Sequence, residues 1–597
     1  MSTKTIEQFF TGKTLEIPPY QSDYAWTTSN IDDLFDDLQE AMELGGGHYL
    51  GTFILSQADK NAPFKVVDGQ QRLTTLTLLL DALINATDDQ EIKSHYRASY
   101  IRHPLHGQKF SVLGINREFF DNLMSGKNPE PDSDGQFRMK AAYEWIRDRV
   151  FALKRAQGEN AIQQWLLSIG NLEVLEFTEA NEGKAIRMFQ SVNDRGVPLS
   201  RMDIAKSLLI YYSNHFLDAE LDRYVSEKFG DAFRAYSRIK RLASESGYQV
   251  NLINRNNFRE DDVFRYHYFA FNGDEHCSNA GFDYNATSET VLEGFLKPTL
   301  KMLRGNKDRL RAFILDYASD LSDFFNQLLV LIEGTRSSKA LYLVLVVGDL
   351  ASTLYPLAIR LAQLNKLDEV VPSAANRSLL QLIELADLRV FKLRGTNPQA
   401  DIAALMRKLD AFTAQEIGMA LCNFTAKFMD DALFKQRLYS EALYRNPGLE
   451  RILIAAEEDI RQQEGSALLG IDELAAIYGD GLTVEHILPQ KPSFDIAGYG
   501  FDDSETYETN IHRIGNLTLL ERGLNSACNN ATVERKVDDQ QLYRTSDFRI
   551  TRNLAAEAPS KTPAFSKSDI DGRCEQLAEL AVRAWPIRTP ELLAENS

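Results

Sequence analysis

The chain has 597 residues, a length that suggests about three or four domains. Its hydrophobic content of 44% and charged content of 25% are ordinary globular values, and its net charge of −19 argues against a passive nucleic-acid coat, which is normally basic. Four scattered cysteines without a C-x-x-C pair argue against a disulfide framework and against a structural zinc site.

The sequence shows no sign of a targeting or membrane segment. Its N-terminus lacks the apolar core of a signal peptide, and the most apolar run, residues 340–347, is too short to span a membrane. We therefore expect a soluble, cytoplasmic protein that has no membrane partner.

The N-terminal part opens with a Pro-rich segment, residues 14–26, which contains Tyr24 and Trp26. Apolar residues on one face then predict a helix over 31–42, with Asn30 as its N-cap. The two aromatic residues have two interpretations: stacking on a base, or packing in a core.

Two strands are expected at 48–56 and 64–67, and a further strand at 172–178 would complete a small sheet. A D-G-Q-Q-R motif follows the second strand directly and leads into a strongly helical stretch. Its residues are Asp68, Gly69, Gln70, Gln71 and Arg72.

A strand that passes through a glycine turn into a helix start is a natural anion site. Backbone N–H groups at the helix N-terminus point outward, and Arg72 adds a charge with bidentate geometry for phosphate. Asp68 is a candidate for holding the Mg²⁺ that accompanies a nucleotide. The alternative makes Asp68 a helix cap and Arg72 a member of a surface ion pair.

A third block, residues 189–207, reads F-Q-S-V-N-D-R-G-V-P-L-S-R-M-D-I-A-K-S. It contains an N-D-R-G turn, after which Ser200 is expected to cap a helix. Two interpretations stay open: a rigid turn, or a nucleotide pocket that includes Asn193, Arg195 and Lys206. From about 208 to 479 the apolar spacing is helical, and the tail regains helical character at 568–584.

The stretch from Leu482 to Lys536 carries the residues for bond-breaking chemistry. A strand ends in Glu485-His486, a Gly-Asn turn at Asn516 opens a second strand, and a helix is expected over 532–543 after Asn525. This layout suits metal-assisted phosphodiester hydrolysis, in which a neutral imidazole takes a proton from the attacking water. Glu485 and Asn525 are the candidate ligands of Mg²⁺ or Mn²⁺, His486 is the candidate base, and Asn516 is expected to lock the loop that presents it.

The run E-H-I-L-P-Q, followed by G-N-L-T-L-L and L-N, resembles the HNH (His-Me finger) nucleases. More closely, it resembles the C-terminal nuclease domain of the GmrSD group of type IV restriction enzymes. The resemblance implies that His486 is the general base and that Asn516 and Asn525 are the second and third motif positions. Lys536 matches a lysine that follows the last motif, for which a phosphate contact is expected.

The D-G-Q-Q-R motif, preceded by Y-A-W and Y-L-G-T, resembles the N-terminal domain of the same group, which is related to the ParB/sulfiredoxin-like fold. The N-D-R-G-x-x-L-S block matches another motif of that domain. The resemblance implies binding and hydrolysis of a nucleoside triphosphate (NTP) at the residues of the D-G-Q-Q-R motif.

We therefore expect a mostly helical α+β fold with three parts: a ParB/sulfiredoxin-like NTPase domain (1–215), a helical linker or recognition region (216–440) and a ββα-metal HNH nuclease domain (441–597). The resemblance implies an NTP-regulated, Mg²⁺-dependent endonuclease that cleaves modified double-stranded phage DNA, with hydroxymethylated or glucosylated cytosine as the substrate base. A phosphorothioate-sensing relative makes modification of the DNA backbone a second option. A homodimer is expected, because one nuclease site per chain cuts one strand. The alternatives are a nuclease toxin that acts on RNA or unmodified DNA, and an NTP-switched DNA-binding adaptor whose nuclease site is inactive.

Overall fold

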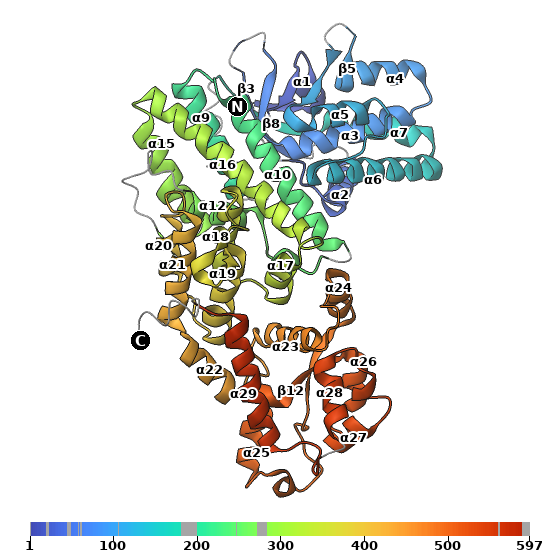
Figure 1. The fold of residues 1–597 in the computed structure, drawn as a ribbon. Helices are drawn as coiled ribbons and strands as arrows, with labels where there is room; N and C mark the ends of the chain where they lie inside the picture. The colour runs from blue at the N-terminus through green and yellow to red at the C-terminus, as the bar shows by residue number, and fades with distance from the viewer. Residues whose placement is uncertain are drawn as a thin grey trace.

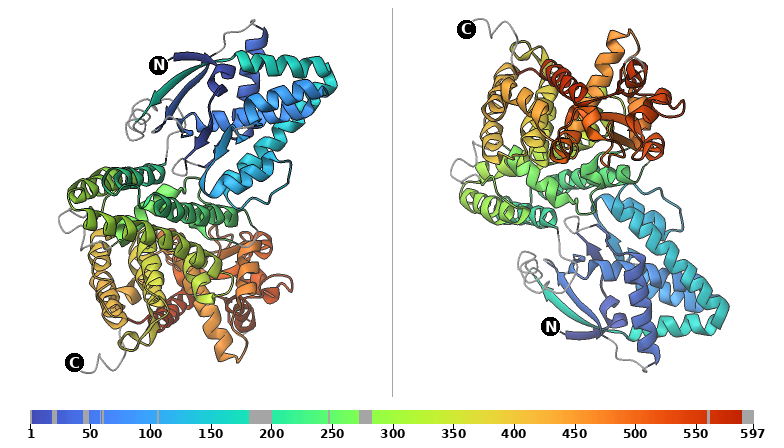
Figure 2. Two further views of the ribbon diagram at one scale, coloured as in Figure 1. Left: turned by 90° about the horizontal axis from the view of Figure 1, so that it is seen from above. Right: turned by 90° about the horizontal axis from the view of Figure 1, so that it is seen from below.

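The computed structural model describes residues 2–18, 23–43, 49–57, 59, 62–104, 107–180, 200–245, 248–271, 283–558 and 561–587. A unit that contains a sheet lies at one end of the molecule, and an orange-red C-terminal unit lies at the other, with helices between them (Figure 1). The two further views also show the N-terminal unit standing apart from the rest (Figure 2). Within the described residues, no helix has the length and apolar character needed to cross a membrane.

The N-terminal unit is built on a mixed six-stranded sheet with the order β1-β8-β3-β4-β2-β7. The strands are β1 (Ser2–Thr5), β2 (Leu15–Ile17), β3 (Tyr49–Ser56), β4 (Phe64–Asp68), β7 (Phe110–Val112) and β8 (Glu173–Glu179). β3 runs antiparallel to β4 and parallel to β8. The three strands predicted from the sequence are confirmed, and the mostly helical α+β class is confirmed with them.

Helix α3 (Gln70–Ala86) lies in the centre of the unit and is buried over most of its length. It packs against α6 (Asp134–Gln157) and α7 (Glu159–Asn171). The helix predicted over 31–42 is α2 (Thr28–Glu43), which begins before the predicted cap. Asn30 therefore lies in the first turn, where its side chain accepts a hydrogen bond from the Thr27 N–H (3.0 Å).

The middle of the chain is helical, as predicted. Long helices α9 (Arg201–Phe216), α10 (Asp222–Ser244) and α16 (Lys307–Gly334) pack side by side (Figure 1). Among the described residues of this region, the only strands are the short pair β9 (Val370–Val371) and β10 (Arg377–Ser378). Further helices complete it, among them α12 (Glu260–Ala270), α15 (Lys297–Leu303), α18 (Tyr355–Gln363), α19 (Leu379–Ala386), α21 (Ala414–Phe428) and α22 (Asp431–Ser440).

The buried apolar residues form two clusters. One extends from Ile6 to Val174 and belongs to the N-terminal unit, and the other extends from Met202 to Ile587. The helical region and the C-terminal unit thus share one continuous core. The three-domain division proposed from the sequence stays a prediction, and the apolar packing places no break near residue 440.

The C-terminal unit contains the predicted strand, loop, strand and helix. Strand β11 (Leu482–His486) pairs antiparallel with β12 (Leu517–Glu521). The other elements are α23 (Leu449–Gln463), α24 (Ile471–Asp480), α25 (Ser504–Ile511), α26 (Arg522–Cys528), α27 (Val533–Asp538), α28 (Arg549–Glu557) and α29 (Lys567–Ala584). The sequence did not predict α26, which contains Asn525. The helix predicted over 532–543 is shorter, because Thr532 caps α27 but the helix ends at Asp538.

Candidate functional site

The candidate nuclease residues project from both faces of β11. Successive side chains of a strand point to opposite faces, so Glu485 and His486 point in opposite directions. His486 faces His512, which follows α25, whereas Glu485 faces Lys536 on α27. The two adjacent motif residues therefore have different surroundings.

His486 is buried, with 4% of its surface exposed. Its Nε2 lies 3.0 Å from Nδ1 of His512, and its Nδ1 lies 3.2 Å from the amide nitrogen of Gln490. The ring of Tyr444 is 4.2 Å from the His486 ring, centroid to centroid. Burial, together with His512 and Lys536, lowers the pKa of His486 to about 3. The imidazole is neutral at pH 7, which is the protonation state that a general base needs.

Asn516 holds the loop that follows His486. Its side-chain oxygen accepts the N–H of Leu488 (2.8 Å), and its amide nitrogen donates to the carbonyls of Leu488 (3.1 Å) and Ile511 (2.9 Å). Its backbone carbonyl accepts the N–H of Ile487 (2.8 Å). The side chain is fully buried, so these bonds are shielded from water. The predicted lock on the loop is present in the structure.

Glu485 and Lys536 form a buried ion pair on the opposite face of β11. The two charged atoms are 2.6 Å apart, and Lys536 is completely buried. The Lys536 ammonium also donates to the carbonyls of His486 (2.7 Å) and Ile487 (3.3 Å). Burial raises the pKa of Glu485, and Lys536 opposes that rise. The phosphate contact of Lys536 stays a prediction. It requires the ammonium to break its contacts with Glu485 and with the two carbonyls.

Asn525 lies beside the same face as Glu485, where its amide nitrogen donates to the hydroxyl of Thr483 (2.7 Å). The Glu485 carboxylate is held by Lys536 and only 5% of the residue is exposed, so in this arrangement it does not fit a metal ligand. Within the described residues, no group of three or more His, Cys, Asp or Glu side chains is placed to hold a metal ion. The ligand roles of Glu485 and Asn525 stay predictions.

Two contacts of His486 were not anticipated from the sequence. Gln490 lies in the same E-H-I-L-P-Q run, so its short spacing from His486 is a signal that could have identified it. Tyr444 lies far upstream and is placed by the chain itself, because the N–H groups of Leu443 and Tyr444 donate to the carbonyl of His512. No local pattern in the sequence indicates that contact.

In the N-terminal unit, the D-G-Q-Q-R motif forms the end of β4 and the start of α3. Gly69 precedes the helix in a left-handed conformation (φ +91°), and no side chain caps the first turn. The carboxylate of Asp68 accepts the Gly69 N–H (2.8 Å), and burial raises its pKa while Arg72 opposes that rise. Gln70 is buried. The uncapped helix start is consistent with an anion site, although no structural observation tests one.

Gln71 and Arg72 fasten neighbouring segments to α3. The Gln71 side chain accepts the Ala25 N–H (2.9 Å) and donates to the carbonyl of Asp23 (2.9 Å). Arg72 donates to the carbonyls of Leu50 (3.0 Å) and Thr52 (3.2 Å) in β3. Among the described residues, the hydrogen bonds of the Arg72 guanidinium go to these backbone carbonyls and not to a surface carboxylate. Whether either residue also contacts a nucleotide stays a prediction.

The neighbouring Y-A-W segment packs inward. Tyr24 is 4% exposed, and its hydroxyl is 2.6 Å from that of Thr75 on α3. Trp26 is partly buried against the same apolar cluster. Core packing, one of the two interpretations made from the sequence, is confirmed for Tyr24.

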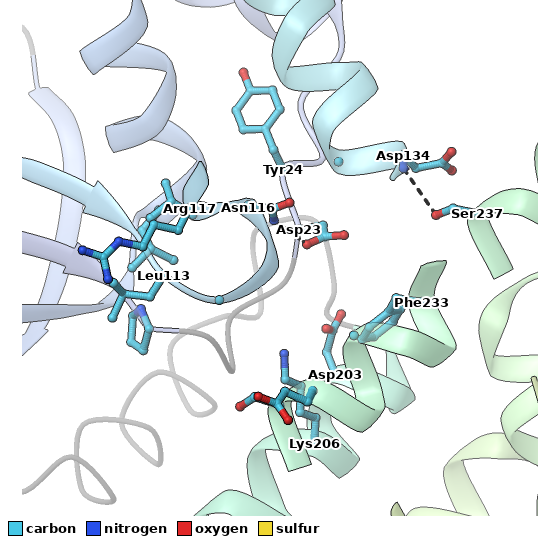
Figure 3. Close-up of a pocket in the computed structure, with 18 of the residues that line it drawn as sticks. Asp23, Tyr24, Leu113, Asn116, Arg117, Asp134, Asp203, Lys206, Phe233 and Ser237 are labelled. Carbon is cyan, nitrogen blue, oxygen red and sulfur yellow. Dashed lines mark hydrogen bonds between the residues drawn. The ribbon is translucent and has the colours of Figure 1, made fainter. Parts of the chain in front are cut away.

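A cavity of about 820 Å³ lies where the N-terminal unit meets α9 and α10. The N-terminal unit contributes Asp23, Asn116 and Asp134, and α9 contributes Asp203 and Lys206 (Figure 3). Burial raises the pKa of Asp203 to about 6 and lowers the pKa of Lys206.

Both units thus line one cavity, and each contributes charged side chains to it. The Asp134 N–H reaches across it to the hydroxyl of Ser237 (3.4 Å). Of the third block, Lys206 reaches this cavity, whereas Asn193 and Arg195 lie outside the described residues.

Comparison with protein families agrees with both ends of the chain. Residues 6–210 match the family described as GmrSD restriction endonuclease, N-terminal domain. Residues 428–580 match the family described as GmrSD restriction endonucleases, C-terminal domain. No curated protein matches the chain. The two matches cover the D-G-Q-Q-R unit and the His486 site in the expected order, and on this evidence the chain belongs to the GmrSD restriction endonuclease family.

Proposed function

We propose that the C-terminal unit cleaves DNA, with His486 as the general base. The observation that carries the proposal is the buried imidazole at the end of β11, followed directly by a loop that the Asn516 side chain holds through hydrogen bonds. A base must present an unprotonated nitrogen at a fixed position, and this arrangement supplies both conditions. Endonucleases of this family generally use divalent metals, and we expect Mg²⁺ or Mn²⁺ to be required.

The residues of the chain account for one part of the reaction. His486 accepts a proton from water, the resulting hydroxide attacks the phosphorus, and the P–O bond to the leaving sugar oxygen breaks. Gln490 faces Nδ1 of His486, so this nitrogen becomes available to water when the amide moves aside. Asn516 keeps the imidazole at its position during the step. Glu485 remains paired with Lys536 and takes no part in this step.

The proposed substrate is phage DNA that carries hydroxymethylated or glucosylated cytosine, and the proposed regulator is an NTP. The cavity between the N-terminal unit and α9 supports regulation by an NTP. It is large enough for a nucleotide, and charged side chains of both signs line it, with Lys206 as the proposed phosphate contact. It lies close to the D-G-Q-Q-R motif, since Gln71 holds the Asp23–Ala25 segment that lines it. A homodimer would place two nuclease sites on the two strands.

The test of the nuclease proposal is a cleavage assay with Mg²⁺ and NTP on three matched DNAs. One carries glucosylated hydroxymethylcytosine, one carries hydroxymethylcytosine, and one is unmodified. We expect double-strand cuts in one or both modified DNAs and none in the unmodified DNA, measured as linear product on a gel. Equal cutting of all three would refute modification dependence, and cutting of tRNA instead would favour the toxin alternative.

The nucleotide proposal predicts that Lys206→Met weakens NTP binding at least about tenfold, because one charge-assisted contact to phosphate is worth roughly 1.5–3 kcal/mol. Binding is measured by calorimetry with a non-hydrolysable analogue. Lys301→Met, in the exposed surface of α15, is the matched control and should bind as the wild type does. Unchanged affinity in a folded Lys206→Met protein would exclude this cavity as the phosphate site.

A further inference from the structure

The C-terminal helix α29 contacts the turn that carries Asn516. The guanidinium of Arg573 donates to the carbonyl of Gly515 through Nε (2.9 Å) and to the carbonyl of Leu517 through Nη2 (3.1 Å). These two carbonyls flank Asn516 on either side. One planar side chain thus binds the backbone before and after the residue that locks the His486 loop.

A second set of contacts closes the same turn from α29. The Gly515 N–H donates to Sγ of Cys574 (3.2 Å), and a Cβ at Gly515 would lie 2.1 Å from the carbonyl oxygen of Ile570. Only glycine permits this approach of the turn to the helix. Arg513, at the start of the turn, pairs with Asp571 (2.5 Å).

The far end of α29 is held by arginines of the helical region, Arg377 and Arg389, and by Arg451 of α23. Arg389 donates to the carbonyl of Trp585 (2.5 Å), and Arg377 donates to the carbonyl of Ala584. The Arg451 guanidinium lies 4.8 Å from the centre of a Trp585 ring. Cations that bind the last carbonyls of a helix satisfy acceptors that have no partner within it. The helix is therefore anchored at one end by the helical region and holds the catalytic turn with the other.

We propose that Arg573 is a positioning residue of the nuclease site, which acts on His486 through the Asn516 turn. This inference rests on the proposed nuclease function. The path consists of hydrogen bonds: Arg573 donates to the carbonyls of Gly515 and Leu517, and Asn516 binds the N–H groups of Ile487 and Leu488. Each bond fixes the position of the next group, and His486 directly precedes Ile487 and Leu488 in the chain.

The test compares Arg573→Met and Arg573→Lys with the wild type in two measurements. The first is cleavage of the DNA that the wild type cuts: we expect kcat to fall about 10- to 100-fold in Arg573→Met with little change in KM, because misplacement of a catalytic group by about 1 Å has an effect of this size. Arg573→Lys should recover part of the rate, since lysine binds one carbonyl but cannot bridge two. Arg583→Met, an exposed arginine of the same helix, is the control with unchanged kcat.

The second measurement is hydrogen exchange in the peptide that contains Ile487 and Leu488, whose N–H groups donate to Asn516. Exchange should accelerate in Arg573→Met and not in Arg583→Met. Gly515→Ala perturbs the same contact from the side of the turn and should behave as Arg573→Met does. This second variant keeps the test decisive if Arg573→Met folds poorly.

The two measurements separate the two proposals. Wild-type kcat and exchange in a folded Arg573→Met protein would overturn the positioning role. A kcat loss that disappears at temperatures well below the melting point of the variant would also overturn it. Faster exchange in a chain whose wild type cuts no DNA would leave the positioning role standing and refute the nuclease function.

Discussion

His486→Ala is expected to abolish DNA cleavage while the protein stays folded. Loss of a general base costs a factor of about 10² to 10⁴ in rate. The second described imidazole at the site is that of His512, whose Nδ1 lies 3.0 Å from Nε2 of His486, and His512→Ala tests whether it contributes to the remaining rate. The measurement is the single-turnover rate on the DNA that the wild type cuts, with NTP and Mg²⁺ present.

His215→Ala is the matched control for this variant. His215 is exposed near the end of α9, in the helical region, and its loss should leave the cleavage rate unchanged. NTP binding by the N-terminal unit should also be unchanged in His486→Ala, which separates a chemical defect from misfolding. A rate within about threefold of the wild type would reject His486 as the base and reopen the adaptor alternative.

The motifs predicted the C-terminal site well because its key contacts are local or come from paired strands. The Glu485-His486 pair closes one strand and Asn516 opens the next, so antiparallel pairing brings them together. A strand ending in a histidine and a turn beginning with Gly-Asn are both visible in the sequence. The same holds for the D-G-Q-Q-R motif, where the strand, the left-handed glycine and the helix are consecutive in the chain.

The contacts that fix these elements were not visible in the sequence. Lys536 was expected to contact phosphate, but α27 places it against β11, where it is completely buried and paired with Glu485. Arg573 and Tyr444 reach the site from distant segments, through packing of the shared core. Sequence periodicity specifies which face of a helix is apolar and leaves open which strand or turn that helix meets.

Glu485 is a further residue whose tertiary contacts the sequence did not predict. The sequence places it next to His486, which suggested a single site for both. Alternation along the strand separates them, and the tertiary position of α27 places Lys536 against the carboxylate. For a metal to bind there, Lys536 must be displaced.

Lys536→Met is expected to destabilise the C-terminal unit by about 3–5 kcal/mol, because removing one partner of a buried ion pair leaves an uncompensated charge. Two carbonyls of the His486–Ile487 segment lose their donor in the same change. The free energy of unfolding is measured by urea denaturation. Arg535→Met, the exposed neighbour on α27, is the control and should change it by less than about 0.5 kcal/mol.

The pH dependence of the variant identifies the carboxylate as the cause. Burial already raises the pKa of Glu485 above its unfolded value, and loss of Lys536 removes the charge that opposes this rise. A carboxyl whose pKa is higher in the folded protein takes up a proton on folding, so the variant should gain stability as the pH is lowered toward 5 and lose it as the pH rises. The double variant Glu485→Gln/Lys536→Met should regain most of the lost stability, because no buried charge remains. A phosphate-binding lysine would give the opposite pattern: unchanged unfolding in Lys536→Met, weaker DNA binding, and a salt dependence of binding that is reduced by about one charge.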